Sequence, residues 1–155
     1  MTANVFRATV TEPPTYVAAV VADWLRDLLL DQRMSFTTET VMSHPAKLDL
    51  FRRARDRGYR SYLYFVATDD PSIQLDHIAR RTQKGGHNVP EDKVTDRYVR
   101  SLAQLPQAIQ LADRAYLFDT TTTLTLFVEY EQGQLRHIYG EAPAWFAMLS
   151  GEPGV

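Results

Sequence analysis

Strand-like and helix-like segments alternate along the middle of the chain, and this alternation constrains the fold more than any other feature. Tyr62–Ala67 is an unbroken apolar run, as expected of a strand that is covered on both faces. Ala115–Asp119 has a second strand pattern, and polar stretches with helical spacing lie between the two. Because strands joined by helices form right-handed crossovers, the pattern predicts an α/β fold with a mostly parallel sheet.

The residues before Tyr62 predict two helices and a further strand. Apolar residues recur every three or four positions after Thr15, which predicts a helix. Ser35–Val41 is short and rich in Thr and Phe, and it is interpreted as a strand. A second helix then begins at a cap residue, has Pro45 in its first turn and ends at Gly58; the candidate caps are Ser43 and His44.

The second half of the chain is punctuated by proline and glycine. A polar helix is expected to about Gln83, a second from Pro90 to Leu102, and a third that Pro106 restarts. Residues 120–130 and 134–139 predict a hairpin around Gln132–Gly133, and an apolar turn over 143–149 is expected to pack on the core.

Composition excludes several function classes. The 155 residues suit a single domain over 1–155, and 17 basic against 19 acidic residues give a net charge of −2. This balance provides no overall field for nucleic acid or an anionic membrane. The chain has no cysteine, and its four histidines show no ligand spacing, so no metal site is expected. With no secretory signal and no membrane-length apolar run, a cytoplasmic protein is expected.

A phosphate cradle of the Walker type is missing from the sequence. Such a cradle needs a glycine-rich loop that ends in Lys followed by Ser or Thr, because the backbone and the ammonium group hold the phosphates. The lysines are Lys47, Lys84 and Lys93. None of them completes the motif.

A candidate substrate site follows the first predicted strand. In a parallel sheet, ligands bind beyond the carboxyl ends of the strands. There, Glu39 and Thr40 precede Ser43 at a helix start, where a carboxylate can orient a hydroxyl group. The alternative is that Glu39 pairs with an arginine and Ser43 only caps the helix. Asp69 and Asp119 follow the other two strands, where ordinary Asx turns are the preferred interpretation.

Basic residues form a second candidate site between 77 and 100. They lie at helical spacing on two faces, joined by a break at Gly85–Gly86–His87. Arginines on such a hinged lid suit phosphate oxygens, whereas the alternative is two solvated faces with acidic partners. Nucleic-acid binding by the same face is a weaker hypothesis because the chain is acidic. The two faces consist of His77, Arg80, Arg81 and Lys84, and of Lys93, Arg97 and Arg100.

An ordered series of motifs resembles the zeta-toxin-like P-loop kinases, also labelled predicted ABC-type ATPases. The resemblance covers about residues 15–120 and is carried by the series, not by any one motif. The motifs are Ser35-Phe-Thr-Thr-Glu-Thr-Val-Met-Ser-His44, Gly58-Tyr59, Tyr62-Leu-Tyr-Phe-Val-Ala-Thr68, Gly85-Gly-His-Asn-Val-Pro-Glu-Asp-Lys93, Arg97-Tyr-Val-Arg-Ser-Leu102 and Ala112-Asp-Arg-Ala-Tyr116.

The resemblance implies a three-layer P-loop kinase fold, ATP and Mg²⁺, and phosphorylation of a small molecule such as UDP-N-acetylglucosamine. It further implies an antitoxin or a second copy as partner, and no nucleic acid or membrane. By position, Glu39, Thr40 and Ser43 correspond to the substrate side. The lid would supply Arg81 and His87 as catalytic groups, and Lys84, Arg97 and Arg100 as phosphate-binding groups.

The sequence departs from the family pattern in two places. Family members carry the P-loop strand, the Walker lysine and a catalytic aspartate ahead of the matching region, so this chain is interpreted as an N-terminally truncated form. The missing strand would lie between 35–41 and 60–67. At Asp119 the family usually continues Asn-Ser, where this chain has Thr120–Thr121. The alternative function is therefore an inactive homologue that acts as a partner-binding subunit.

Overall fold

The computed structural model describes residues 14–69 and 91–150. The chain divides into two compact units, Met1–Thr38 and Glu39–Val155, which are treated separately. The described part of the first unit is dominated by helix α1 (Pro14–Asp31), which confirms the helix predicted from Thr15. Arg33, in the turn that follows the helix, has a left-handed conformation (φ 55°). None of the helices within the two described ranges combines the length and apolar character that a bilayer crossing requires.

The second unit is built on a four-stranded mixed sheet in the order β1-β2-β3-β4. Strands β1 (Tyr62–Ala67) and β2 (Arg114–Asp119) are parallel. Strands β3 (Thr125–Glu131) and β4 (Gln134–Ile138) add on in antiparallel fashion. The prediction of a mostly parallel sheet is therefore wrong. The connection from β2 to β3 is too short for a crossover, so the chain turns back beside the strand that it has just left.

The hairpin between β3 and β4 confirms the prediction for Gln132–Gly133. These two residues have φ of 51° and 77°, the left-handed pair that a tight two-residue hairpin turn requires. The amide of Gln110 donates to the Gly133 carbonyl oxygen over 3.3 Å and so connects the tip of the hairpin to the preceding helix.

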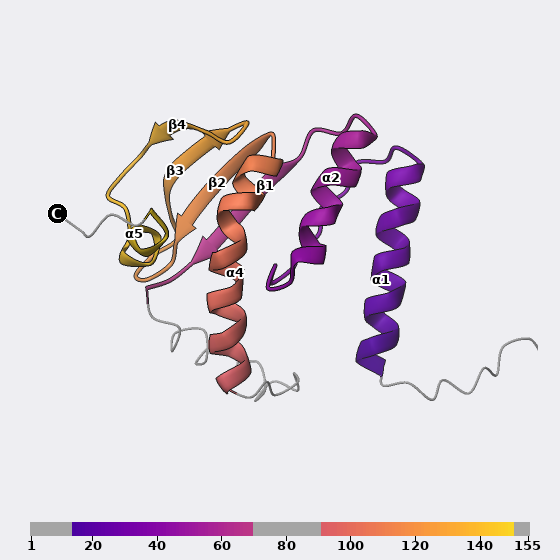
Figure 1. Cartoon of the computed structure of the whole chain (residues 1–155), viewed down its shortest axis with the longest axis horizontal. Coiled ribbons are helices and arrows are strands. Elements are labelled where there is room, and N and C mark those ends of the chain that lie inside the picture. The colour runs from indigo at the N-terminus through magenta and orange to yellow at the C-terminus, as the bar shows by residue number, and fades with distance from the viewer. Residues whose placement is uncertain (1–13, 70–90, 151–155) are drawn as a thin grey trace, which may run out of the picture. The chain divides into compact units, whose positions relative to one another are not determined.

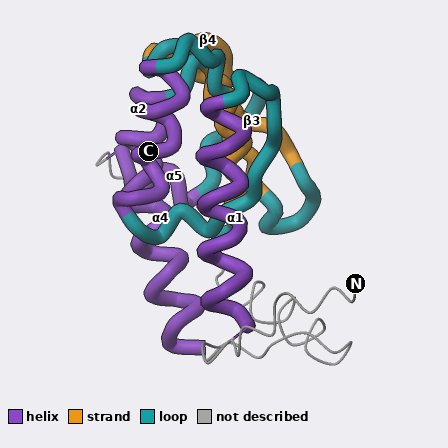
Figure 2. Tube along the Cα trace, turned by 90° about the vertical axis from the view of Figure 1, so that its right-hand side faces the viewer, coloured by secondary structure: helices purple, strands orange, loops and turns teal. Residues whose placement is uncertain are grey.

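One face of the sheet carries the core. In both views, helices α4 (Glu91–Leu111) and α5 (Ala144–Ser150) lie on the same side of the strands (Figures 1 and 2). Leu63 and Phe65 point to this side and are buried, whereas Tyr64 on the other face is 64% exposed. The expectation that Tyr62–Ala67 is covered on both faces is wrong, because burial alternates strictly along the strand.

The predicted strand at Ser35–Val41 is also wrong: this segment has no regular structure. The reason is that a strand needs a neighbour for its backbone groups, and within the described residues the sheet ends at β1. Met42 anchors the segment instead. It is buried in the core in a left-handed conformation (φ 52°).

The second helix begins and ends where the sequence predicts. His44 is the cap, since its Nδ1 accepts the backbone N–H of Ala46 over 3.2 Å. A short 3-10 helix, η1 (Pro45–Leu48), leads into α2 (Asp49–Asp56), and Gly58 follows in a left-handed conformation (φ 76°). Leu48 and Ala54 of these helices are buried.

Helix α4 differs from its prediction, because Pro106 does not restart a helix but lies inside one that runs from Glu91 to Leu111. Proline costs one backbone hydrogen bond at this point. The helix tolerates the loss because buried residues before and after the proline, including Leu105 and Ala108, pack on the same core. The predicted helix to Gln83 and the Gly85–His87 break lie outside the described residues.

Helix α5 confirms the apolar turn expected at 143–149. Trp145 is almost fully buried, and its ring packs against Phe65, Phe127 and Phe146 with centroid separations of 5.9, 5.5 and 5.8 Å. Helix α5, the last described helix, thus covers the core near the carboxyl ends of β1 and β2.

Candidate functional site

The carboxyl ends of β1 and β2 meet at one edge of the sheet. The backbone N–H and the hydroxyl of Thr120 both donate to the carbonyl oxygen of Ala67, over 2.8 and 3.1 Å. The backbone N–H of Asp69 donates to the hydroxyl of Thr121 over 2.9 Å. Two segments that are far apart in sequence, 67–69 and 119–121, therefore form one polar surface at the carboxyl ends of the strands, which is called the polar edge below. Open α/β sheets bind their ligands at this place.

Asp119 forms the Asx turn that was preferred on sequence grounds. Its Oδ2 accepts the backbone N–H of Thr121 over 3.1 Å, and its Oδ1 accepts the hydroxyl of the same residue over 2.8 Å. Oδ1 also accepts the indole N–H of Trp145 over 3.1 Å. Both oxygens are thus engaged in holding the loop and α5.

Asp69 connects β1 to the same helix, because its Oδ1 accepts the backbone N–H of Trp145 over 2.6 Å. Sequence analysis did not associate Trp145 with either aspartate. Trp145 is far from both aspartates in the sequence. The only local indication that the two aspartates lie close together was that each follows a predicted parallel strand.

Tyr98 and Thr68 form the buried floor of this edge. The hydroxyl of Tyr98 donates to the backbone oxygen of Thr68 over 2.5 Å. Burial, followed by the charges of Asp69 and Asp119, raises the pKa of Tyr98 to about 12, so the phenol is neutral at physiological pH. The side-chain hydroxyl of Thr68 is buried and has no hydrogen-bond partner in the described part of the chain. Tyr98 is buried with the core residues of the sheet.

The predicted substrate residues lie in the irregular segment before η1. Glu39 is exposed, and no ion pair joins it to an arginine among the described residues. The hydroxyl of Thr40 accepts the backbone N–H of Met42 over 3.3 Å. Ser43 is half-buried beside the helix start, but the capping contact is made by His44.

The predicted phosphate-binding residues are described only on α4. Arg97 is exposed and takes part in no ion pair within the described ranges. Arg100 is paired with Asp96 over 2.5 Å, as in the alternative of a solvated face. Arg81, Lys84 and His87 lie outside the described residues. No described contact joins Arg97 or Arg100 to the segment that holds Glu39.

The described residues do not by themselves fit a magnesium ion. Among 14–69 and 91–150, no three acidic or histidine side chains converge on one point. The carboxylates of the polar edge among the described residues are those of Asp69 and Asp119. Both accept hydrogen bonds from Trp145. A metal at this edge would need ligands from a nucleotide, from water or from other residues.

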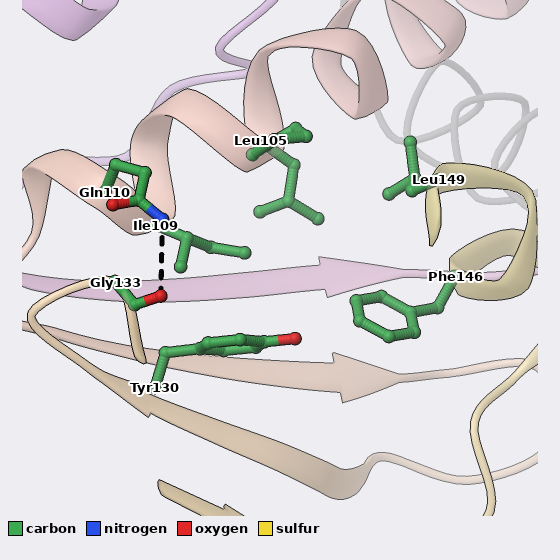
Figure 3. Close-up of a pocket in the computed structure, with 8 residues that line it drawn as sticks. Leu105, Ile109, Gln110, Tyr130, Gly133, Phe146 and Leu149 are labelled. Atoms are coloured by element: carbon green, nitrogen blue, oxygen red, sulfur yellow. Dashed lines mark hydrogen bonds between the residues drawn. The ribbon is translucent and has the colours of Figure 1, made fainter. Parts of the chain in front are cut away.

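A separate pocket opens between α4, the hairpin and α5 (Figure 3). It measures about 210 Å³, and the hydroxyl of Tyr130 points along it toward Phe146 and Leu149. Burial raises the pKa of Tyr130. The described residues that line this pocket include no charged side chain, so they do not suit phosphate groups. The lining residues are Leu105, Pro106, Ile109, Gln110, Tyr130, Gly133, Phe146 and Leu149.

Comparison with known proteins identifies a protein family. The family model described as Zeta toxin matches residues 10–141, which is most of the chain. No curated protein and no solved structure matches the chain. The matched range includes the irregular segment with Glu39, both parallel strands and the polar edge at Asp119. On this evidence the chain belongs to the zeta toxin family.

Proposed function

We propose that the chain belongs to a kinase that transfers the terminal phosphoryl group of ATP to a hydroxyl group of a small molecule, with a nucleotide sugar such as UDP-N-acetylglucosamine as the first acceptor to test. The family match over residues 10–141 carries this proposal. It spans both candidate sites that the sequence singled out.

The polar edge of the sheet supports the proposal geometrically. Parallel strands β1 and β2 bring Thr68, Asp69 and Asp119 together at their carboxyl ends. Hydrogen bonds from α4, α5 and the loop after β2 fix this edge, so groups positioned there need little rearrangement before a reaction. The neutral Tyr98 phenol donates to the backbone oxygen of Thr68, whose buried hydroxyl has no hydrogen-bond partner among the described residues.

The proposed roles follow the sequence hypothesis. Glu39, Thr40 and Ser43 are proposed to bind and orient the acceptor hydroxyl. Arg81 and His87 are proposed to act on the transferring phosphoryl group. Lys84, Arg97 and Arg100 are proposed to hold the donor phosphates, since guanidinium groups form paired hydrogen bonds with phosphate oxygens. In the transfer, the acceptor oxygen bonds to the terminal phosphorus and its hydroxyl proton is released to water. The bond between that phosphorus and the bridging oxygen breaks, and ADP leaves.

A second candidate function is a catalytically inactive, partner-binding subunit. Two observations favour it: the 155 residues contain no glycine-rich loop ending in Lys-Ser or Lys-Thr, and β1 has no neighbour on its outer side in the described residues. Such a chain would bind neither ATP nor the acceptor on its own, and it would be found together with a partner.

Calorimetric titration of Mg·ATP into the purified chain distinguishes the two functions. The same titration is made on the chain extended by any coding sequence that precedes Met1 in the same reading frame. Saturable binding by either form, with phosphate transfer to UDP-N-acetylglucosamine detected by mass spectrometry, supports the kinase. Binding without transfer to that sugar supports the kinase and rejects this acceptor. If neither form binds ATP, the kinase proposal is wrong and the subunit is favoured.

A further inference from the structure

Among the described residues, no strand pairs with the outer row of backbone hydrogen-bonding groups of β1. The carbonyl oxygen of Ser61 accepts the backbone N–H groups of Asp113 and Arg114, and that of Ala67 accepts from Thr120. In a strand the N–H and C=O of one residue point to the same side, and successive residues alternate. Odd-numbered residues of β1 therefore bond to β2. The N–H and C=O groups of Tyr62, Tyr64 and Val66 point to the free edge.

The two edges of the sheet differ in their protection. At the far edge, β4 carries Arg136 and His137, and its pairing with β3 is interrupted by a register shift at Glu129/Tyr130. Charges and irregular pairing are the usual means by which edges avoid joining other strands. Strand β1 has neither: it contains no charged residue, no proline and no register shift, and its pairing with β2 is regular throughout.

The exposed side chains of β1 lie on the same residues as its free backbone groups. Tyr62, Tyr64 and Val66 are 44%, 64% and 51% exposed. The ring of Tyr64 stacks on that of Tyr116 at 5.2 Å, so its orientation is fixed in advance. An added strand would thus gain both hydrogen bonds and ordered aromatic contacts.

We propose that β1 pairs antiparallel with β1 of a second copy of the chain. The buried faces of both copies must lie on one side, which restricts the pairing to registers that place even-numbered residues opposite even-numbered residues. Among these, only the register centred on Tyr64 pairs all three free residues of β1. It places Tyr64 opposite Tyr64 of the second copy, on the twofold axis, and Tyr62 opposite Val66. Each is a hydrogen-bonded pair, in which both residues exchange N–H···O bonds. The two four-stranded sheets then form one continuous sheet.

Pairing of β1 with itself brings no like charges together, because the strand contains no charged residue. Arg60 precedes β1, and its guanidinium lies over the ring of Tyr62 at 6.0 Å. The same uncharged surface is contributed by each copy, as a symmetric dimer requires.

Single cysteines test the register, because the chain has no cysteine of its own. Paired residues of this kind have Cα atoms about 5.5 Å apart, which a disulfide can bridge. Tyr64→Cys is therefore expected to form a covalent dimer on mild oxidation. Tyr62→Cys is the matched control: the two copies of residue 62 would lie about 13 Å apart along the strands and should not cross-link. Equal cross-linking of both variants, or none, would overturn the proposed register.

Charge substitution tests the interface without relying on oxidation. Light scattering on the full chain should give twice 17.7 kDa at high concentration. Tyr64→Lys and Tyr64→Glu should each give the monomer mass, because like charges face each other on the axis. An equimolar mixture of the two variants should recover the dimer, which a misfolded variant would not do. A monomeric unsubstituted chain, or a mixture that stays monomeric, would refute the proposal.

Discussion

The indole Nε1–H of Trp145 donates to Oδ1 of Asp119 over 3.1 Å, and this contact holds α5 against the end of β2. The donor lies on the last described helix and the acceptor ends the second strand. Because the backbone N–H of Trp145 also donates to Asp69, one buried residue sets the position of both carboxylates. The shape of the polar edge therefore depends on the packing of α5.

Replacement of Trp145 should separate its packing from its hydrogen bond. Trp145→Phe keeps most of the ring contacts but leaves Asp119 without its indole donor. The free energy of unfolding should therefore fall by about 1–3 kcal/mol. Trp145→Ala also creates a cavity and should cost about 3–5 kcal/mol. Urea unfolding measures both. Trp24→Phe is the control: Trp24 is 62% exposed, and a change of more than about 0.5 kcal/mol there would be unexpected.

The pKa of Tyr98 predicts a loss of stability in alkali. Its pKa is about 12 in the folded chain against 10.0 as the ordinary value. The contribution is fully present below pH 10, because the phenol is then neutral in both states. It is lost as pH rises from 10 to 12, since only the unfolded chain releases the proton. The difference of two units between the pKa of Tyr98 in the folded chain and its ordinary value corresponds to about 2.7 kcal/mol in the free energy of unfolding.

Urea unfolding at pH 9 and pH 11.5 measures this loss, and Tyr98→Phe provides the comparison. The relevant quantity is the difference between the two chains in the stability lost between these pH values, because this difference isolates the Tyr98 hydroxyl. The unsubstituted chain should lose more stability with pH than Tyr98→Phe does. Parallel losses would show that the Tyr98 phenol does not carry the effect.

Local signals in the sequence were sufficient for the elements that depend on near neighbours. The hairpin at Gln132–Gly133, the cap at His44 and the end of α2 at Gly58 are each fixed by a few adjacent residues. Pro106 shows the limit of such signals. Its local preference is to begin a helix, but the packing of Leu105 and Ala108 on one core keeps α4 continuous.

Partner-dependent features were not predictable from local patterns. Ser35–Val41 has strand-forming residues, yet it has no strand beside it and stays irregular. The apolar run of β1 does not reveal which of its faces is covered. The polar edge joins Asp69, Asp119 and Trp145 through tertiary packing, so the sequence indicated two strand ends but not the helix that connects them.

The two arginines of α4 should differ in their importance for nucleotide binding. Arg97 makes no ion pair in the described part of the chain, whereas Arg100 is held by Asp96. On the proposed function, Arg97→Ala should weaken ATP binding about tenfold, the value of one charged hydrogen bond. Arg100→Ala should have a smaller effect because its charge is already compensated. Calorimetry measures both, and a larger loss for Arg100→Ala would contradict this assignment.

Gly133 should be intolerant of a side chain for two separable reasons. Its φ of +77° is unfavourable for alanine, and a Cβ would lie 2.3 Å from Oε1 of Gln110. Gly58 shares the positive φ (+76°) but has open space, so Gly58→Ala reports the backbone cost alone, about 1 kcal/mol. Gly140 has neither problem, and Gly140→Ala should be nearly neutral.

Unfolding free energies should therefore fall in the order Gly140→Ala, Gly58→Ala, Gly133→Ala, with the last losing about 2 kcal/mol. The excess at Gly133 comes from displacing Gln110, whose amide donates to the Gly133 carbonyl. Gln110→Ala should remove that excess, so the double variant should be destabilised by less than the sum of the single changes. Strict additivity would show that the helix and the hairpin tip are not coupled through this contact.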